Sequence, residues 1–550
     1  MVINMINSFL DNLRKGLKEA IAKLGIEVEL NDIVLEVPKD QSNGDYATNI
    51  AMRLARVARK APVMIANDIV ANLDQDALNL SKIEVAGAGF INFTIDINYL
   101  LKVIFRVLNE ENYGFVNLGN NQSINLEFVS ANPTGYLHVG HGRGAAYGDS
   151  LANILTKAGY KVSREHYVND AGNQITNMAL SVYERYKELF GLPFKMEDDY
   201  YHGKEIITIA QKLKDEYNDK FIENFDIDFF KNYGTEILLN NLKQDLLKFN
   251  VKFDTWFSEK SLYATNQVEN VLNLLKERNF LYEKEGAIWL KTSEFDDEKD
   301  RVIVKSDGSY TYLLPDIAYH ANKLSRNFDH LINVLGADHH GYVNRLKAAV
   351  TMVGGNADLI DVELLQMVRV MENGTEVKMS KRSGKAITLI DLVDEVGTDA
   401  LRYFYVSKAL NTHMDLDLDI MRKKSNENPV YYAQYAYARV ASVFRKFEEN
   451  NKYQVVSEFN HINKDKVKNI CLTLLKYPVI VEEAASKRLV HKVCHYIDEL
   501  AYQLHSYYNE EKIISENIDE TLEKLTILKA LNVVLKDALT LLGIQAYEKM

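Results

Sequence analysis

The chain has 550 residues, enough for about three domains, and its hydrophobic (47%) and charged (26%) fractions are those of a packed globular protein. Its net charge of −12 argues against nonspecific binding to nucleic acid, although one face can still be basic. No apolar run is long enough to cross a bilayer, and Cys471 and Cys494 lack the spacing of a zinc site or a disulfide framework. We therefore expect a cytoplasmic protein without bound zinc.

Residues 1–115 mix helical and strand patterns and predict a small α+β domain. Its first element is an amphipathic helix at 5–24, whose acidic residues distinguish it from a secretory leader. An Asn- and Gly-rich stretch at 109–125 marks the boundary to the next domain. The elements predicted between these two segments are a strand at 33–37, a turn at 43–45, a helix, and a strand at 89–95.

Residues 120–410 have the pattern of an α/β domain. A strand at 124–130, a loop with Pro and Gly, a helix at 142–158 and a strand at 161–168 form one βαβ unit, which implies a parallel sheet. The other predictions for this domain are a helical insertion at about 180–300, a hairpin at 301–314, and strands at 331–336 and 364–371.

Beyond residue 400 the pattern is almost entirely helical. The stretch 421–429, which contains lysines, asparagines and Pro429, interrupts the helical periodicity. We therefore predict a C-terminal all-α bundle over residues 421–550.

The segment His138-Val139-Gly140-His141 stands at the start of a predicted helix. A helix N-terminus presents free N–H groups and partial positive charge, which suit phosphate, and two imidazoles three residues apart lie on the same face. Gly140 allows the backbone to approach a ligand closely. An isolated copy of this pattern is explained equally well by two capping or packed histidines. The strand before it and the helix after it favour a phosphate site.

The segment Lys378-Met379-Ser380-Lys381-Arg382 places three positive charges in five residues, between Gly374 and Gly384. A flexible basic loop of this kind can close on a triphosphate and neutralise the charge that develops on leaving pyrophosphate. Alone, the segment is explained equally well by a solvated basic turn. Its occurrence after the histidine motif in one chain favours the phosphate role.

The two motifs, in this order, resemble the signature sequences of class I aminoacyl-tRNA synthetases, known as HIGH and KMSKS. Val139 stands where that family has Ile, and Arg382 stands where it has Ser. Longer blocks resemble the arginyl-tRNA synthetases and extend over almost the whole chain: residues 43–52, 85–93, 130–155, 167–175, 253–263, 313–320, 335–342 and 428–439.

This resemblance implies a ligase of protein biosynthesis with a Rossmann-type parallel-sheet core. It would form arginyl-adenylate from L-arginine and ATP with Mg²⁺, then transfer arginine to the terminal adenosine of tRNA(Arg). His138, His141, Lys378 and Lys381 would be catalytic, and the same residues with Gly140 would bind ATP. The first signature region would comprise Ala131, Asn132, Pro133, Thr134, Gly135, Tyr136, Leu137, His138, Val139, Gly140 and His141.

The resemblance also implies that Glu127, Ser130, Asn132, Tyr312 and Asp316 bind arginine, with Asn132 at its backbone end. A guanidinium group requires carboxylates that accept two-point contacts, which Glu127 and Asp316 can provide. From the residues alone, other interpretations stay open: Glu127 as a solvent-facing strand residue, Tyr312 as a core tyrosine, and Asp316 as a helix cap.

In the helix at 431–439, tyrosines alternate with small residues ahead of Arg439. Such rings can stack on unpaired anticodon bases, and we predict that Tyr435 and Arg439 contact tRNA. Burial in the helix core is the alternative, and the two interpretations can hold for different rings. By resemblance, the C-terminal domain binds the anticodon and the N-terminal domain contacts the outer corner of the tRNA.

We expect a monomer that does not bind membranes. Three other functions share part of the pattern: a different class I synthetase, such as one for cysteine, a small-molecule nucleotidyltransferase, and a tRNA-binding relative without catalysis. The arginine-type blocks disfavour the first and the long helical C-terminal domain disfavours the second. The intact His138, His141 and Lys381 disfavour the third.

Overall fold

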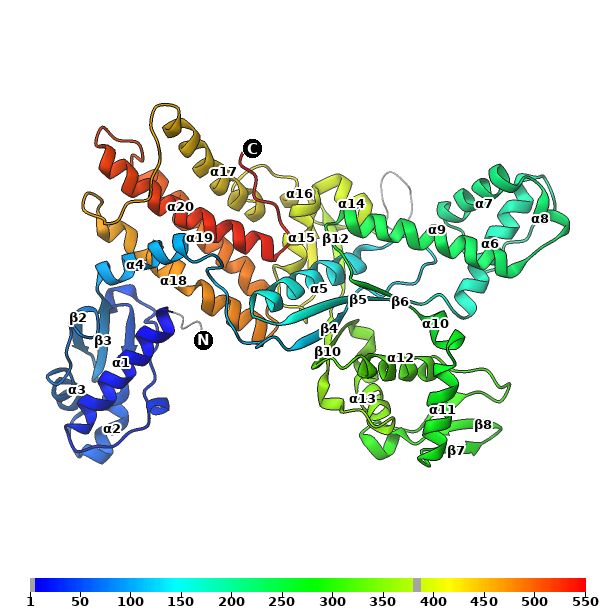
Figure 1. Ribbon diagram of the computed structural model, residues 1–550, viewed down its shortest axis with the longest axis horizontal. Helices are drawn as coiled ribbons and strands as arrows, with labels where there is room; N and C mark the ends of the chain where they lie inside the picture. Colours follow the sequence, from blue (N-terminus) through cyan, green and yellow to red (C-terminus); the bar gives the residue numbers. More distant parts are fainter. Residues whose placement is uncertain (1–4, 379–386) are drawn as a thin grey trace.

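A computed structural model describes residues 5–378 and 387–550. The molecule is elongated, with a small N-terminal domain at one end, a central parallel sheet, and a C-terminal helical bundle along one side (Figure 1). Two outgrowths project from the sheet at the end opposite the N-terminal domain (Figure 1). None of the helices in the described part of the chain combines the length and apolar character needed to span a bilayer.

The N-terminal domain is α+β, as predicted, and packs helices against a three-stranded sheet of order β1-β3-β2. The predicted strand at 33–37 is wrong: Glu36 forms only an isolated bridge with Ala47, because Pro38 follows directly and has no N–H to continue a ladder. The elements are α1 (Met5–Ala22), β1 (Tyr46–Thr48), α2 (Ile50–Ala58), α3 (Pro62–Val70), β2 (Leu80–Ala86), β3 (Phe90–Ile95) and α4 (Ile97–Asn109).

The central sheet has five parallel strands in the order β11-β10-β4-β5-β6, which confirms the predicted α/β fold. The chain runs from β4 to β5 on one side of β4 and later returns to β10 on the other side. Ligands collect at the carboxyl ends of strands beside such a switch point. The elements are β4 (Ser123–Glu127), α5 (Val139–Lys157), β5 (Lys161–Val168), β6 (Thr255–Ser258), β10 (His330–Gly336) and β11 (Ile360–Leu365).

The prediction of one helical insertion at about 180–300 needs correction, because β6 returns the chain to the central sheet within it and divides it into two excursions. Only the first is all helical; the second contains a three-stranded antiparallel sheet and extends past residue 300. The first contains α6 (Asn173–Leu189), α7 (Lys204–Tyr217), α8 (Lys220–Glu223) and α9 (Ile227–Lys248). The second contains α10 (Glu259–Ala264), α11 (Gln267–Glu277), β7 (Leu281–Lys284), β8 (Ala287–Leu290), β9 (Arg301–Val304), α12 (Leu313–Ser325) and, after β10, α13 (Val343–Met352).

Two further strand predictions need correction. The hairpin at 301–314 is reduced to one bridge between Val304 and Tyr310, and β9 pairs with β8 instead. Leu313 begins α12 because Leu314 and Ile317 are buried on one helical face and Pro315 is tolerated in a first turn. The predicted strand at 364–371 is two strands, β11 and β12 (Val368–Glu372), which belong to different sheets.

The C-terminal part is a helical bundle, as predicted, apart from the short β14 (Met414–Asp417) that precedes it. Buried Arg402 on α15 joins it to the core by donating to the Leu542 carbonyl at 2.8 Å and to Asp149 Oδ2 at 2.7 Å. The elements are β13 (Thr375–Glu376), α14 (Leu389–Val396), α15 (Thr398–Val406), α16 (Leu418–Met421), α17 (Pro429–Glu448), α18 (Lys464–Ser486), α19 (His491–Glu510) and α20 (Ile518–Leu541).

A buried histidine on β5 makes the fold sensitive to acid. The His166 ring packs on Trp256 at a centroid distance of 4.5 Å and meets Phe253 at 5.3 Å. Burial lowers the pKa of His166 to about 4, against about 6.5 in an unfolded chain. Between these values the unfolded state binds the extra proton, so stability falls as pH falls through this window.

Replacing His166 by Leu is therefore expected to remove part of the acid sensitivity. By linkage, the histidine costs about 2 kcal/mol of unfolding free energy at pH 5 relative to pH 8. Urea unfolding at the two pH values measures this difference in the wild-type chain and in the variant. An equal pH dependence in both would contradict the assignment.

Candidate active site

The first signature segment contacts the chain that follows the second signature at the start of α5. His138 is the N-cap of this helix and forms an isolated antiparallel bridge with Thr388, and the N–H of Leu389 donates to the Leu137 carbonyl at 2.7 Å. Lys378, the first residue of the second motif, is exposed directly after Val377. Residues 379–386, including Lys381, lie outside the described part of the chain. The backbone thus brings the segment that begins six residues after the second motif, Thr388 and Leu389, against the first motif.

The two histidines of the first motif are arranged as paired hydrogen-bond donors. Nδ1 of His138 accepts from the N–H of Gly140 at 3.1 Å, and Nδ1 of His141 accepts from the N–H of His138 at 3.2 Å. The rings stack with centroids 3.7 Å apart. Because each Nδ1 is an acceptor, each neutral ring carries its proton on Nε2.

Partial removal from water favours the neutral form of both imidazoles, more strongly at His141 than at His138, whose side chain is exposed. It lowers the pKa of His138, and it lowers the pKa of His141 to about 3 with further contributions from His138 and His166. The site therefore offers phosphate two neutral N–H donors and a helix N-terminus rather than two cations. The His141 ring stays neutral across the pH range in which an ordinary histidine titrates, because its pKa is about 3.

Two glycines make this close packing possible. A Cβ atom on Gly140 would lie 3.1 Å from Cε1 of His138, and one on Gly142 would lie 2.7 Å from both Leu389 and the Tyr405 hydroxyl. Gly142 thereby allows α5 to lie against α14 and α15, which follow the second motif. The helix start and the exit of the loop are held together by packing as well as by the backbone bridge.

The loop from β4 to α5 carries strained backbone. Val129 and Ser130 have φ values of 68° and 41°, a region that a β-branched residue such as valine rarely adopts. The Ser130 hydroxyl donates to Glu127 Oε1 at 2.9 Å and accepts from the N–H of Tyr167 at 3.2 Å. Strain of this kind persists only where the surroundings enforce it, and it gathers at functional sites.

The predicted arginine-binding acids come from two elements. Glu127 ends β4, is 6% exposed and forms an ion pair with Lys323. Burial alone would raise the pKa of the Glu127 carboxyl, but the charge and hydrogen bond of Lys323 outweigh it and hold that pKa below its usual range. Asp316 lies in the first turn of α12 with its side chain 26% exposed, and Oδ1 lies 3.2 Å from His320 Nδ1.

These positions remove the alternative interpretations of three residues. Glu127 does not face solvent, and Tyr312, with 71% of its surface exposed, is not a core residue. The N-cap of α12 is Tyr312 and not Asp316, whose carboxylate faces His320. Asn132 is half-buried on the loop before α5 and donates to Gln174 Oε1 at 2.5 Å.

Sequence reasoning missed several polar residues around the two acids: His320, Lys323, Tyr167 and Glu259. Burial, followed by the charges of Glu259 and Asp316, raises the pKa of Tyr167 far above its usual range, so these groups lie together. A signal was present for two of them. Asp316, His320 and Lys323 recur at spacings of four and three, which places polar groups on one face of an otherwise apolar helix.

The tyrosines of α17 divide between core and surface. Tyr437 is buried, whereas Tyr435 is 44% exposed and stacks on Tyr431 with centroids 6.2 Å apart and planes within 4°. The guanidinium of Arg439 lies 3.7 Å from the Tyr508 ring centroid. The core interpretation therefore holds for Tyr437, and Tyr435 is exposed, as its predicted contact with tRNA requires.

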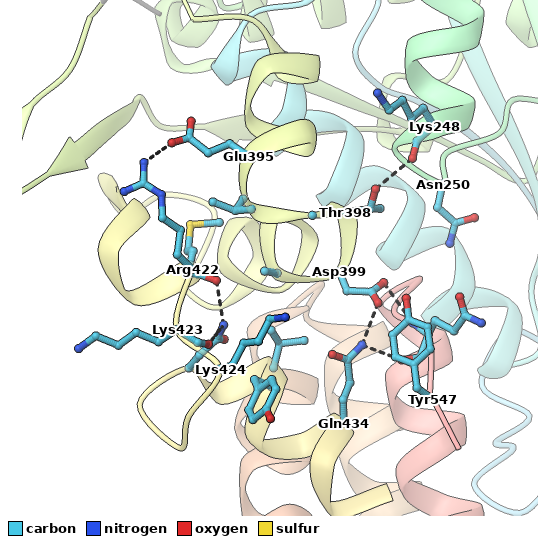
Figure 2. Close-up of a pocket in the computed structure, with 18 residues that line it drawn as sticks. Lys248, Asn250, Glu395, Thr398, Asp399, Arg422, Lys423, Lys424, Gln434 and Tyr547 are labelled. Atoms are coloured by element: carbon cyan, nitrogen blue, oxygen red, sulfur yellow. Dashed lines mark hydrogen bonds and ion pairs between the residues drawn. The ribbon is translucent and has the colours of Figure 1, made fainter. Parts of the chain in front are cut away.

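A polar cavity of about 650 Å³ lies beside Tyr431 of α17 (Figure 2). Its walls come from the end of α9, from α14, α15 and α17, and from the C-terminal segment. At its wall Asp399 accepts from Gln434 Nε2 at 2.8 Å and from the N–H of Gln545 at 3.2 Å. Lys423 and Lys424 come from the loop before α17, and Tyr431 also lines the cavity. The cavity lies at the junction between the bundle and the domain that carries the two motifs.

Family models match the chain in three consecutive parts. The model described as "Arginyl tRNA synthetase N terminal domain" matches residues 11–95, and "tRNA synthetases class I (R), catalytic domain" matches residues 103–416. The third, "DALR anticodon binding domain", matches residues 433–550. These matches follow the order of the structural parts.

Curated relatives match over the full length. The arginine–tRNA ligase of Bacillus subtilis is 50% identical and that of Geobacillus kaustophilus 46% identical, each covering 100% of both chains. The solved Thermus thermophilus arginyl-tRNA synthetase superposes with a TM-score of 0.72 at 20% identity, covering 98% of this chain and 99% of that one, which supports the fold alone. The chain belongs to the arginyl-tRNA synthetase family of class I aminoacyl-tRNA synthetases.

Proposed function

We propose that this protein is an arginine–tRNA ligase, which activates L-arginine with ATP and transfers it to the terminal adenosine of tRNA(Arg). The observation that carries the proposal is the bridge between His138 of the first signature segment and Thr388, six residues after the second one. Full-length identity of 50% to an arginine–tRNA ligase supports the choice of amino acid.

For the first step, the arginine carboxylate attacks the α-phosphorus of ATP and pyrophosphate leaves. The substrate is the nucleophile, so the protein contributes positioning and stabilisation of charge. His138 and His141 donate from Nε2 to phosphate oxygens, while Lys378 and Lys381 neutralise the departing pyrophosphate. Mg²⁺ accompanies ATP as a counter-ion bound mainly through phosphate oxygens. In the second step, a ribose hydroxyl of tRNA, the 2′-hydroxyl in this class, attacks the adenylate carbonyl and loses its proton, while the bond from the carbonyl carbon to the phosphate oxygen breaks and AMP leaves.

For arginine, Asp316 accepts the guanidinium and Tyr312 packs beside it. Ser130 and Asn132 lie on the strained loop between β4 and α5, where they can reach the backbone end of the amino acid. The partial exposure of Asp316 supports this role, since a fully buried carboxylate could not meet a substrate.

The N-terminal domain, residues 1–115, and the bundle, residues 421–550, contact tRNA in this proposal, and residues 120–410 carry out the chemistry. Tyr435 stacks on an anticodon base, and Arg439 adds charge beside it. In this proposal the protein acts as a monomer. The cytoplasm, where tRNA is charged, is the proposed location.

The proposal is tested by attachment of labelled arginine to tRNA(Arg). We expect acid-precipitable label that depends on ATP and is not formed with lysine or cysteine. Label from cysteine would favour another class I synthetase. A nucleotidyltransferase would transfer nucleotide without charging tRNA, and a tRNA-binding relative would bind tRNA without charging it.

Replacing Tyr435 by Ala is expected to raise KM for tRNA(Arg) about tenfold, because loss of one aromatic stack costs roughly 1–3 kcal/mol. Turnover at saturating tRNA is expected to change less than about twofold, since the ring is remote from the chemistry. The matched control is Phe194→Ala, which removes an exposed ring from the first excursion. Equal effects in the two variants would contradict the role of Tyr435.

A further inference from the structure

A continuous line of polar side chains runs beneath the proposed arginine site, between β4, β10 and α12. Its three inner members, His320, Lys323 and Asn333, are each at most 2% exposed. It begins at Glu127, whose carboxylate pairs with Lys323, and it ends at Asp316. The line therefore joins the two acids assigned to arginine.

The contacts along this line are short and consecutive. Lys323 Nζ lies 2.9 Å from Asn333 Oδ1, and Asn333 Nδ2 lies 2.8 Å from His320 Nε2. His320 Nδ1 lies 2.9 Å from the Asp316 carbonyl and 3.2 Å from Asp316 Oδ1. Each member has a partner on both sides.

The chemistry of the groups fixes the direction of every hydrogen bond. An ammonium group only donates, so Asn333 must turn its oxygen to Lys323 and its NH₂ to His320. His320 Nε2 is then an acceptor, and the proton of the neutral ring lies on Nδ1. That proton faces Asp316. This N–H donates to the Asp316 carbonyl at 2.9 Å, and the same nitrogen lies 3.2 Å from Oδ1 of the Asp316 carboxylate. The ion pair at one end thus determines which ring atom faces Asp316 at the other end.

The same line sets the charge of the pocket. Lys323 neutralises Glu127, which leaves Asp316 as the one carboxylate of the pair without a buried cationic partner. Asp316 is then the carboxylate of this pair that is free to meet the guanidinium, beside Glu259, a carboxyl whose pKa is raised by burial. Two uncompensated carboxylates would instead repel each other and favour protonation of one of them.

Stability alone does not explain these residues. A buried ion pair roughly breaks even against apolar side chains of the same volume, because desolvation offsets the attraction between the charges. Every member of this line has a hydrogen-bond partner, so the line avoids the penalty of an unsatisfied buried polar group. It gains little stability over an apolar core in return. A functional reason for keeping it is therefore needed.

We propose that Lys323, Asn333 and His320 are positioning residues that hold the Asp316 carboxylate ready for the arginine guanidinium. The proposal rests on the proposed function, because it assumes that Asp316 binds arginine. None of the three residues touches substrate in this account, and each acts through the next.

The first test compares two replacements of His320. Leu removes the donor to Asp316. Gln at position 320 stands four residues after Asp316 on the same helix, so its amide can still donate to Asp316 and accept from Asn333. We expect His320→Leu to raise KM for arginine roughly 10- to 100-fold, the value of a lost hydrogen bond to a charged group, with KM for ATP nearly unchanged. His320→Gln is expected to recover most of the loss.

The matched control is Tyr319→Phe, which removes the hydroxyl that donates to Glu165 Oε1 at 2.6 Å from the same helix. It breaks a buried hydrogen bond without touching the line. We expect it to lower the unfolding midpoint while leaving KM for arginine within about twofold of the wild-type value.

The second test uses the nearly isosteric Asn333→Asp, which keeps the contact to Lys323 but has no donor for His320. The neutral ring must then place its proton on Nε2 and lose the Nδ1 donor, while the doubly protonated ring retains it. The charged groups around this ring are Asp316 and Lys323 on its own helix and Glu127 on β4, with Tyr319 beside it. We expect KM for arginine to rise with pH in this variant and to stay flat in the wild-type protein.

The outcomes separate this proposal from the proposed function. If the wild-type protein shows no arginine-dependent activity, the function itself fails. If it is active, a KM for arginine within about twofold of wild type in His320→Leu, or a flat pH profile in Asn333→Asp, overturns the positioning role. A selective rise in KM for arginine, recovery by Gln and a pH-dependent Asn333→Asp variant support it.

Discussion

Replacing Asp316 by Asn is expected to lower kcat/KM for arginine about a thousandfold, which corresponds to roughly 4 kcal/mol, within the range measured when one partner of a desolvated charge pair is removed. The shape of the side chain is kept, so the loss reports its charge. KM for ATP is expected to stay within about threefold, because the adenylate-forming groups lie on α5 and the second motif. Steady-state pyrophosphate exchange at varied arginine measures both constants.

The control for this variant is Glu294→Gln, which removes an exposed carboxylate from the 3₁₀ turn Thr292–Phe295 in the same excursion. It should leave both constants within about twofold, as surface charges contribute little. If Asp316→Asn raises KM for ATP as much as KM for arginine, Asp316 supports the site in general and does not recognise the guanidinium.

Replacing Lys381 by Ala is expected to slow adenylate formation about 10²- to 10³-fold, the usual cost of removing one group that stabilises charge in a transition state. Arginine binding should hardly change, because the lysine acts on the leaving pyrophosphate. Single-turnover formation of arginyl-adenylate gives the rate, and equilibrium binding of arginine gives the affinity.

The control is Arg382→Ser, which also removes one positive charge from the second motif. Serine is the residue that the class I signature has at this position. We expect it to retain most of the rate. An unchanged rate in Lys381→Ala would remove the role assigned to this lysine. Equal losses in the two variants would indicate a general effect of loop charge.

The parts of the fold that the sequence predicted are those with local signals. The helix at 5–24, the βαβ unit around the first motif and the strand at 331–336 each combine a clear apolar period with turn residues at their ends. The strand predicted at 33–37 failed although its apolar pattern was right, because Pro38 has no N–H with which to extend the ladder beyond the bridge between Glu36 and Ala47. The hairpin at 301–314 failed because burial of Leu314 in a helix outweighed its strand-like composition.

The candidate site was predictable only in part, for a related reason. The motif residues can be identified from their spacing in the sequence. The partner of Glu127, in contrast, is Lys323, which lies 196 positions further along the chain. No local pattern specifies such a pairing, which depends on how α12 lies across β4 and β10. The spacing of Asp316, His320 and Lys323 marked one polar helix face, and only the fold shows what that face meets.

The most direct test of the central claim is arginine-dependent exchange of labelled pyrophosphate into ATP, measured with and without tRNA(Arg). A single site in which both signature segments serve one ATP beside an arginine pocket predicts exchange that needs arginine and is present when tRNA(Arg) is bound. Absence of exchange under both conditions would contradict the enzyme assignment, and exchange driven by a different amino acid would contradict the arginine pocket.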